Sequence, residues 1–205
     1  MKKHNVDSSL MQVSGADISW AHNIIFNNDA LVYKNTLDDH YLQYFPPVQK
    51  KLNEKIAVIN FLELKDSVPL DILDISTGCG HLMALMQHLG HRCQGTEIPQ
   101  SIEILQSLYN YYKLQVLPLT VEKQIPINLS NTYDVITSLR TVFNENWTKN
   151  DWIFLRDNLL DFLNPSGKIF IKTNIKFIPN SFNDASRVLG PPIKGWQSLT
   201  YLIEK

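Results

Sequence analysis

The fold of this chain is decided by one stretch of sequence, LDILDISTGCGHL at residues 70–82. It begins with an apolar run, passes through a turn of small residues that includes two glycines, and continues directly into a helical pattern. This order is typical of a buried strand that leads through a glycine-rich loop into a helix. Because the first N–H groups of a helix have no partner within the helix, such a loop presents hydrogen-bond donors to a ligand.

Alternating strand and helix patterns continue from this stretch to the C-terminus. The predicted strands cover residues 70–75, 92–96, part of 115–121, 133–137, 168–173 and 198–203. The predicted helices begin near residue 80, at Pro99 and after the capping-box sequence at residues 148–151. This alternation predicts an α/β fold with a doubly wound, mostly parallel sheet, in which ligands bind beyond the carboxyl ends of the strands.

A helical extension is predicted ahead of this core. A helical apolar pattern starts at Asp17, which is expected to cap the helix. One or two further helices are expected within residues 36–64, interrupted at Pro46 because proline cannot continue a helix interior. We therefore predict two parts, a helical extension or lid at residues 1–66 and an α/β domain at residues 67–205.

Size and composition exclude several classes of protein. The chain has 205 residues, of which 44% are hydrophobic, so it is long enough and apolar enough to bury a core. Its formal net charge of -1 gives no bulk attraction for nucleic acid or an anionic membrane. Two cysteines predict free thiols and a cytoplasmic location. No apolar run approaches the roughly 18 residues of a membrane span.

A carboxylate at the end of the second predicted strand narrows the class of ligand that the loop is expected to bind. Glu97 follows the glycine turn by about 20 residues, where an acid can accept both hydroxyls of an adenosine ribose. Alone, the loop could be a plain tight turn, and Glu97 could be a solvated acid favoured by the helix dipole. Together they favour a nucleoside-containing cofactor. Met83 stands where a dinucleotide site has its third glycine, which argues against NAD or FAD.

These motifs resemble those of class I S-adenosylmethionine-dependent methyltransferases over residues 66–174. The segment at 73–80 is similar to the family's first motif, Glu97 to its ribose-binding acid, 133–138 to its fourth strand, and 163–171 to its turn into the fifth strand. The resemblance implies the family's fold, including an antiparallel C-terminal strand. Because the tail after residue 174 is short, one strand of the family's C-terminal pair is expected to be missing or irregular.

Finer details of the sequence resemble a narrower group. Residues 90–91, 97–99 and 142–144, with Trp147, are similar to a group of uncharacterised bacterial small-molecule methyltransferases. Two serines depart from the wider family's pattern, because Ser76 and Ser166 stand where the family has glycine.

The resemblance implies S-adenosyl-L-methionine as the cofactor. The residues expected to bind it are Asp74, Ser76, Thr77, Gly78, Cys79, Gly80, Glu97, Ile98 and Ser138. Asp74 would order the loop and the methionine end of the cofactor, Glu97 would hold the ribose, and Ser138 would lie beside the methyl group. The adenine is expected near residues 120–122.

Three residues are candidates for the acceptor side, and each has a structural alternative. Arg140 could bind an acidic acceptor or form a surface salt bridge. Asn144 could orient an acceptor or cap a helix, and His40 could cover the pocket or serve only packing. His81, in the first turn after the loop, is expected to face solvent. No cluster of Cys or His has zinc-binding spacing, so no metal is expected.

The predicted function is methyl transfer, by direct displacement, to an oxygen or nitrogen of a small molecule. Residues 138–141 lack the N/D-P-P-Y/F motif that amino-group methylases of nucleic acids carry after the fourth strand, so nucleic acid is not the expected partner. Two alternatives stay open. One is a non-catalytic domain that binds S-adenosylmethionine, and the other is an NAD-dependent oxidoreductase.

Overall fold

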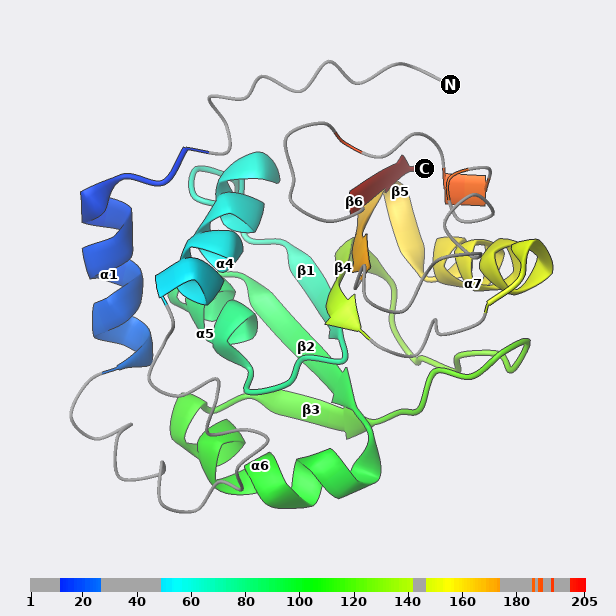
Figure 1. The fold of residues 1–205 in the computed structure, drawn as a ribbon, viewed down its shortest axis with the longest axis horizontal. Coiled ribbons are helices and arrows are strands. Elements are labelled where there is room, and N and C mark those ends of the chain that lie inside the picture. The colour runs from blue at the N-terminus through cyan, green and yellow to red at the C-terminus, as the bar shows by residue number, and fades with distance from the viewer. Residues whose placement is uncertain are drawn as a thin grey trace. The chain divides into compact units, whose positions relative to one another are not determined.

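The computed structural model describes residues 12–26, 49–141, 147–173, 186, 188–189, 193 and 200–205. The chain divides into two compact units. Unit 1 contains residues 70–76 and the described residues from 119 onward, and unit 2 contains the described residues up to 69 together with residues 77–118. In the described part, six strands form one sheet in the order β3-β2-β1-β4-β5-β6 (Figure 1).

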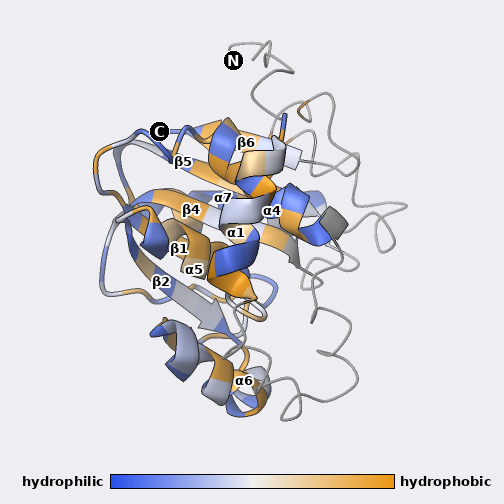
Figure 2. Ribbon diagram, turned by 90° about the vertical axis from the view of Figure 1, so that its left-hand side faces the viewer, coloured by the Kyte–Doolittle hydropathy of each residue, from blue (hydrophilic) through white to orange (hydrophobic). Residues whose placement is uncertain are grey.

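Unit 1 carries four strands and one long helix. They are β1 (Asp71–Ile75), β4 (Tyr133–Thr141), α7 (Lys149–Asp161), β5 (Leu163–Thr173) and β6 (Thr200–Glu204). β4 pairs in parallel with β1 and with β5, whereas β6 runs antiparallel to β5. Figure 2 shows apolar stretches in β4 and β5, with polar residues between and beside them.

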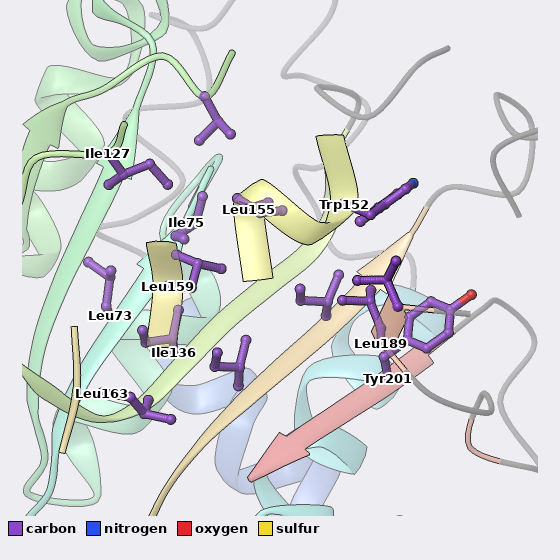
Figure 3. Packing of buried hydrophobic residues seen from close by; sticks show 14 of the residues in the cluster. Leu73, Ile75, Ile127, Ile136, Trp152, Leu155, Leu159, Leu163, Leu189 and Tyr201 are labelled. Atoms are coloured by element: carbon purple, nitrogen blue, oxygen red, sulfur yellow. The ribbon is translucent and has the colours of Figure 1, made fainter. Parts of the chain in front are cut away.

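The core of unit 1 lies between α7 and one side of its strands. Alternate strand residues belong to a single buried cluster with the apolar residues of α7. Figure 3 shows Leu73, Ile75 and Ile136 near Leu155 and Leu159 of α7. Asp74 lies between Leu73 and Ile75, and Thr137 follows Ile136, so the alternation of side chains along a strand places Asp74 and Thr137 on the other face of the sheet.

Unit 2 contains the N-terminal helices and the strand–helix–strand segment after the loop. Its elements are α1 (Gly15–Ile25), α4 (Gln49–Phe61), α5 (His81–His88), β2 (Arg92–Glu97), α6 (Pro99–Tyr112) and β3 (Gln115–Pro118). α1 packs against α4 and α5, and β2 pairs in parallel with β3. Among the residues described, no helix combines the length and apolar character needed to cross a membrane.

The observed strand order confirms the predicted fold class. Because the order runs outward from β1 and β4 in both directions, the sheet is doubly wound, and β6 supplies the expected antiparallel C-terminal strand. Two local details differ from the prediction. Ser14 caps α1 in a capping box, and Asp17 is the third helical residue, whose side chain accepts from the Ser14 N–H. β5 begins at Leu163, because Leu163 already pairs with Tyr133 before the register shift.

Candidate functional site

The glycine loop connects β1 to α5 through several residues in left-handed backbone conformations. Ser76, Gly78 and Gly80 have φ angles of 56°, 54° and 73°. Within unit 2, Thr77 N–H donates to the Thr96 carbonyl at 3.0 Å, and Gly80 N–H donates to the Thr77 carbonyl at 3.1 Å. Gly80 is the N-cap of α5, which begins at His81, close to the start that the sequence predicted. The loop is therefore a folded turn attached to β2.

The two glycines of the loop have different surroundings. Among the described residues, no atom lies within 4 Å of a Cβ atom built on Gly78, so within this part of the chain that side of the loop is open. A Cβ atom on Gly80 would lie 2.2 Å from Leu114 Cδ1 and 3.6 Å from the Tyr109 ring. Gly80 thus permits close packing at the end of α6, and Gly78 is the glycine that leaves room for a ligand.

Glu97 lies at the carboxyl end of β2 and holds the loop directly. Its Oε2 accepts a 2.9 Å hydrogen bond from Gly78 N–H, and its Oε1 accepts one of 2.9 Å from Ile98 N–H. The residue is only 8% exposed, so it is not the solvated acid that was the alternative interpretation. Each carboxylate oxygen has two lone pairs, so after these bonds each oxygen can still accept a hydroxyl. The carboxylate therefore keeps capacity to accept further hydrogen bonds.

Tyr109 is a loop contact that the sequence analysis did not identify. Its hydroxyl donates a 2.6 Å hydrogen bond to the Gly78 carbonyl. The side chain lies on α6 and is fully buried. The sequence places Tyr109 on the apolar face of that helix, but no sequence signal indicates which carbonyl its hydroxyl reaches. Both peptide groups of Gly78 are consequently held, the N–H by Glu97 and the carbonyl by Tyr109.

In unit 1, three of the predicted cofactor residues, Asp74, Ser76 and Ser138, lie at or beside the carboxyl end of β1. Asp74 lies opposite Thr137, and Ile75 lies opposite Ser138. Ser76 follows directly after β1. Thr137 Oγ1 donates a 2.6 Å hydrogen bond to Asp74 Oδ1, and both residues are buried. Thr137 was not predicted as a site residue, yet it fixes the orientation of the Asp74 carboxylate.

Burial shifts the pKa values of two ionisable side chains next to the loop, Cys79 and His81. It raises the pKa of the Cys79 thiol to about 12, against the smaller opposing effect of Lys55 and Lys51, so Cys79 is not a thiolate nucleophile at neutral pH. Burial also lowers the pKa of His81 well below its usual value, with Lys55 and Lys51 acting in the same direction. His81 is therefore neutral at physiological pH.

The expectation that His81 faces solvent is wrong. The residue is 6% exposed. Its ring lies edge-to-face with Phe26, at a centroid distance of 5.6 Å, and with Tyr112, at 6.0 Å. The physical reason is tertiary, because the end of α1 and the last turn of α6 cover the first turn of α5. A single-helix pattern cannot reveal this cover.

The acceptor-side candidates are not tested by these contacts. Asn144 and His40 lie outside the described residues, and Arg140 is described only as a backbone position on β4. Within the described residues, no group of three or more His, Cys, Asp or Glu side chains could hold a metal ion.

Neither a family model nor a curated protein sequence matches the chain. Solved structures resemble it in fold. TrmN from Thermus thermophilus is 15% identical over 74% of this chain and 48% of that chain, with a TM-score of 0.54. The ribosomal protein L11 methylase from Lactobacillus delbrueckii subsp. bulgaricus is 15% identical over 77% and 80% of the two chains, with a TM-score of 0.52.

A third similar structure is that of CalS10, an amino pentose methyltransferase from Micromonospora echinaspora, with S-adenosylmethionine bound. It is 18% identical over 60% of this chain and 50% of that chain, with a TM-score of 0.49. The chain spans about half the length of the first structures it matches. The likeness to the TrmN and ribosomal protein L11 methylase structures, at 15% identity, shows a shared fold alone.

Proposed function

We propose that this chain is an S-adenosylmethionine-dependent methyltransferase that acts on an oxygen or nitrogen of a small-molecule acceptor. The observation that carries the proposal is the Glu97 carboxylate, buried at the end of β2 and bonded to Gly78 N–H at 2.9 Å. It joins a ribose-binding acid to a loop with an open glycine face. The fold shared with a ribosomal protein L11 methylase supports the methyltransferase part of this proposal and does not bear on the acceptor.

The cofactor would be held by residues that the loop and the strand ends provide. They are Asp74, Ser76, Thr77, Gly78, Cys79, Gly80, Glu97, Ile98 and Ser138. Glu97 would accept the ribose hydroxyls, and the open side of Gly78 would admit the cofactor close to the backbone. Asp74, oriented by Thr137, would order the methionine end. In this proposal, residues 67–205 form the cofactor-binding α/β domain, and residues 1–66 form a helical extension or lid.

The chemistry asked of the protein is mainly positioning. S-adenosylmethionine, when bound, supplies an electrophilic methyl group on a positively charged sulfur. The residues of the chain need to align the acceptor with that methyl group and exclude water, and orientation of this kind can supply about 7–11 kcal/mol of the barrier. Arg140, Asn144 and His40 remain the proposed acceptor-side residues. Cys79 has no role as a nucleophile, because burial keeps it protonated.

The small-molecule acceptor is inferred from charge and from a missing motif. A net charge of -1 offers little attraction for a polyanion, and residues 138–141 do not carry the proline-rich motif of amino-group methylases. The proposed location is the cytoplasm, in keeping with the two free cysteines.

One specific observation favours the first alternative function, and another counts against the second. A non-catalytic cofactor-binding domain is favoured by Ser76, which holds a left-handed conformation where the resembled family has glycine. An NAD-dependent oxidoreductase is disfavoured by Met83. In a dinucleotide site, the third glycine lies on the helix and allows the helix to pack closely on the strand. Here Met83 stands on the helix, and its Sδ atom lies 2.5 Å from the position of a Cβ on Gly95, so the small residue of this contact is Gly95 of β2.

The first test is a Glu97→Ala variant assayed by calorimetry with S-adenosylmethionine. Loss of a charged hydrogen-bond partner is expected to weaken binding at least tenfold, or about 1.4 kcal/mol. Glu103→Ala, which removes an exposed acid from α6, is the matched control and should bind as the wild type does. Unchanged affinity in a folded Glu97→Ala variant would mean that the ribose lies elsewhere.

Two further measurements separate the alternatives. If the wild type binds NAD tightly and S-adenosylmethionine not at all, the methyltransferase proposal is wrong. Transfer of labelled methyl groups from S-adenosylmethionine to any acceptor in a cell extract would exclude the non-catalytic alternative. A crystal soaked with S-adenosylhomocysteine would then show the shape and polarity of the acceptor space beside the sulfur.

A further inference from the structure

The Gly78 residue of the loop is held from two directions by side chains of different elements. Glu97 Oε2, at the end of β2, accepts from Gly78 N–H at 2.9 Å. The Tyr109 hydroxyl, on α6, donates to the Gly78 carbonyl at 2.6 Å. The first contact places a candidate ligand group on the loop. The second has no direct role in binding, because Tyr109 is fully buried behind the loop.

We infer that Tyr109 is a positioning residue that fixes the Gly78 peptide in its cofactor-binding conformation. Gly78 has a φ angle of 54°, and glycine populates many other backbone conformations. A hydrogen bond at each of its peptide groups selects one of them during folding. The loop then loses little conformational entropy when a ligand binds, because it is already ordered in the free protein. This reduction of the entropic cost of binding is the general basis of preorganisation.

The packing of the Tyr109 ring supports this role. Its ring carbons lie 3.6 Å from the position of a Cβ on Gly80, so the ring supports the same loop from behind. The open face of Gly78 is a different one, since no atom of the residues that the structure describes lies within 4 Å of its Cβ position. Tyr109 therefore controls where the open face points while leaving it free for a ligand.

The inference rests on the proposed function and is tested with Tyr109→Phe, which removes only the hydroxyl oxygen. The affinity for S-adenosylhomocysteine, measured by calorimetry well below the melting temperature, should fall about three- to tenfold. The matched control is Tyr112→Phe, because the Tyr112 hydroxyl makes a similar 2.7 Å bond from the same helix to the Ile25 carbonyl. It should lower stability comparably and leave the affinity unchanged.

Two readouts distinguish positioning from a general loss of stability. In a double-mutant cycle, Tyr109→Phe should cost less affinity in the Glu97→Gln background, because both side chains act through Gly78. Without any ligand, hydrogen exchange at the Gly78 amide should be faster in Tyr109→Phe and unchanged in Tyr112→Phe. Additive effects, or equal changes in both tyrosine variants, overturn the inference. If the wild type binds no S-adenosylhomocysteine but Gly78 exchange responds, the proposed function fails and the loop-positioning inference stands.

Discussion

Two serines adopt a backbone conformation that normally favours glycine. Ser76 and Ser166 have φ angles of 56° and 64°, and they stand where the resembled methyltransferases have glycine. A side chain in the left-handed region costs about 1–2 kcal/mol. Both serines therefore carry backbone strain in the folded state.

Ser166 gives a test of this strain away from the candidate site. It is exposed in the turn of β5, so Ser166→Gly removes no buried contact. We expect an increase of roughly 0.5–1 kcal/mol in the free energy of unfolding, measured by urea denaturation, because relief of strain exceeds the entropy that glycine adds to the unfolded chain. Ser130→Gly, at an exposed position without a positive φ, should be neutral or destabilising. A destabilised Ser166→Gly would contradict the argument.

At the scale of single elements, the capping of helices agrees closely with the sequence pattern. Thr148 caps α7, and Asp151 completes the capping box, with its Oδ2 accepting from Thr148 N–H at 2.8 Å. Hydrogen bonds from Thr148 and Gln124 hold the pKa of Asp151 below its usual value against the opposing effect of burial. The box fixes the start of the helix that covers the core of unit 1.

The Thr148 cap can be tested with two substitutions at one position. Thr148→Ala removes the hydroxyl that bonds to Asp151, and it should lower the free energy of unfolding by about 1 kcal/mol. Thr148→Ser keeps the hydroxyl and should stay near the wild-type value. Urea denaturation of the three proteins measures the difference. Equal losses in both variants would show that the methyl group of Thr148, and not its hydroxyl, stabilises the helix start.

At the scale of the whole molecule, the pH dependence of folding includes a buried neutral histidine. Contacts from α1 and α6 enclose His81, and Lys55 and Lys51 on α4 also disfavour its charge. Above its ordinary pKa of 6.5 the residue is neutral in both the folded and unfolded states. Below that value His81 binds a proton in the unfolded chain and stays neutral in the folded chain, so the free energy of unfolding falls as the pH drops.

The expected size of this effect is about 1.4 kcal/mol between pH 7.5 and pH 5.5, if His81 stays neutral in the fold throughout. His81→Phe, which suits the aromatic neighbours, should lose that part of the pH dependence. His88→Gln changes an exposed histidine at the end of the same helix and serves as the control. Chemical denaturation across this range provides the measurement. Parallel pH profiles for the wild type and His81→Phe would refute the role of His81.

The sequence by itself determined the class of fold and the location of the loop. Strand and helix periodicity, the glycines at 78 and 80, and the capping box at 148–151 are local signals, because each depends on residues close together in the chain. For the same reason the sequence could place Glu97 at the end of β2, next to the start of α6. The positions of β1, α5, β2 and α6 follow these signals within a few residues.

Only the tertiary structure decided what these groups touch. The bond from Tyr109 to Gly78 joins residues 31 positions apart, and the bond from Thr137 to Asp74 joins residues 63 positions apart. The ring contacts that bury His81 join it to Tyr112 and Phe26, which lie 31 and 55 positions away. Such contacts depend on how elements pack, and several packings satisfy the same periodicity. The two loop glycines look equivalent in sequence. Their surroundings separate them, because Leu114 and Tyr109 fill the space beside Gly80, whereas no described residue fills the space beside Gly78.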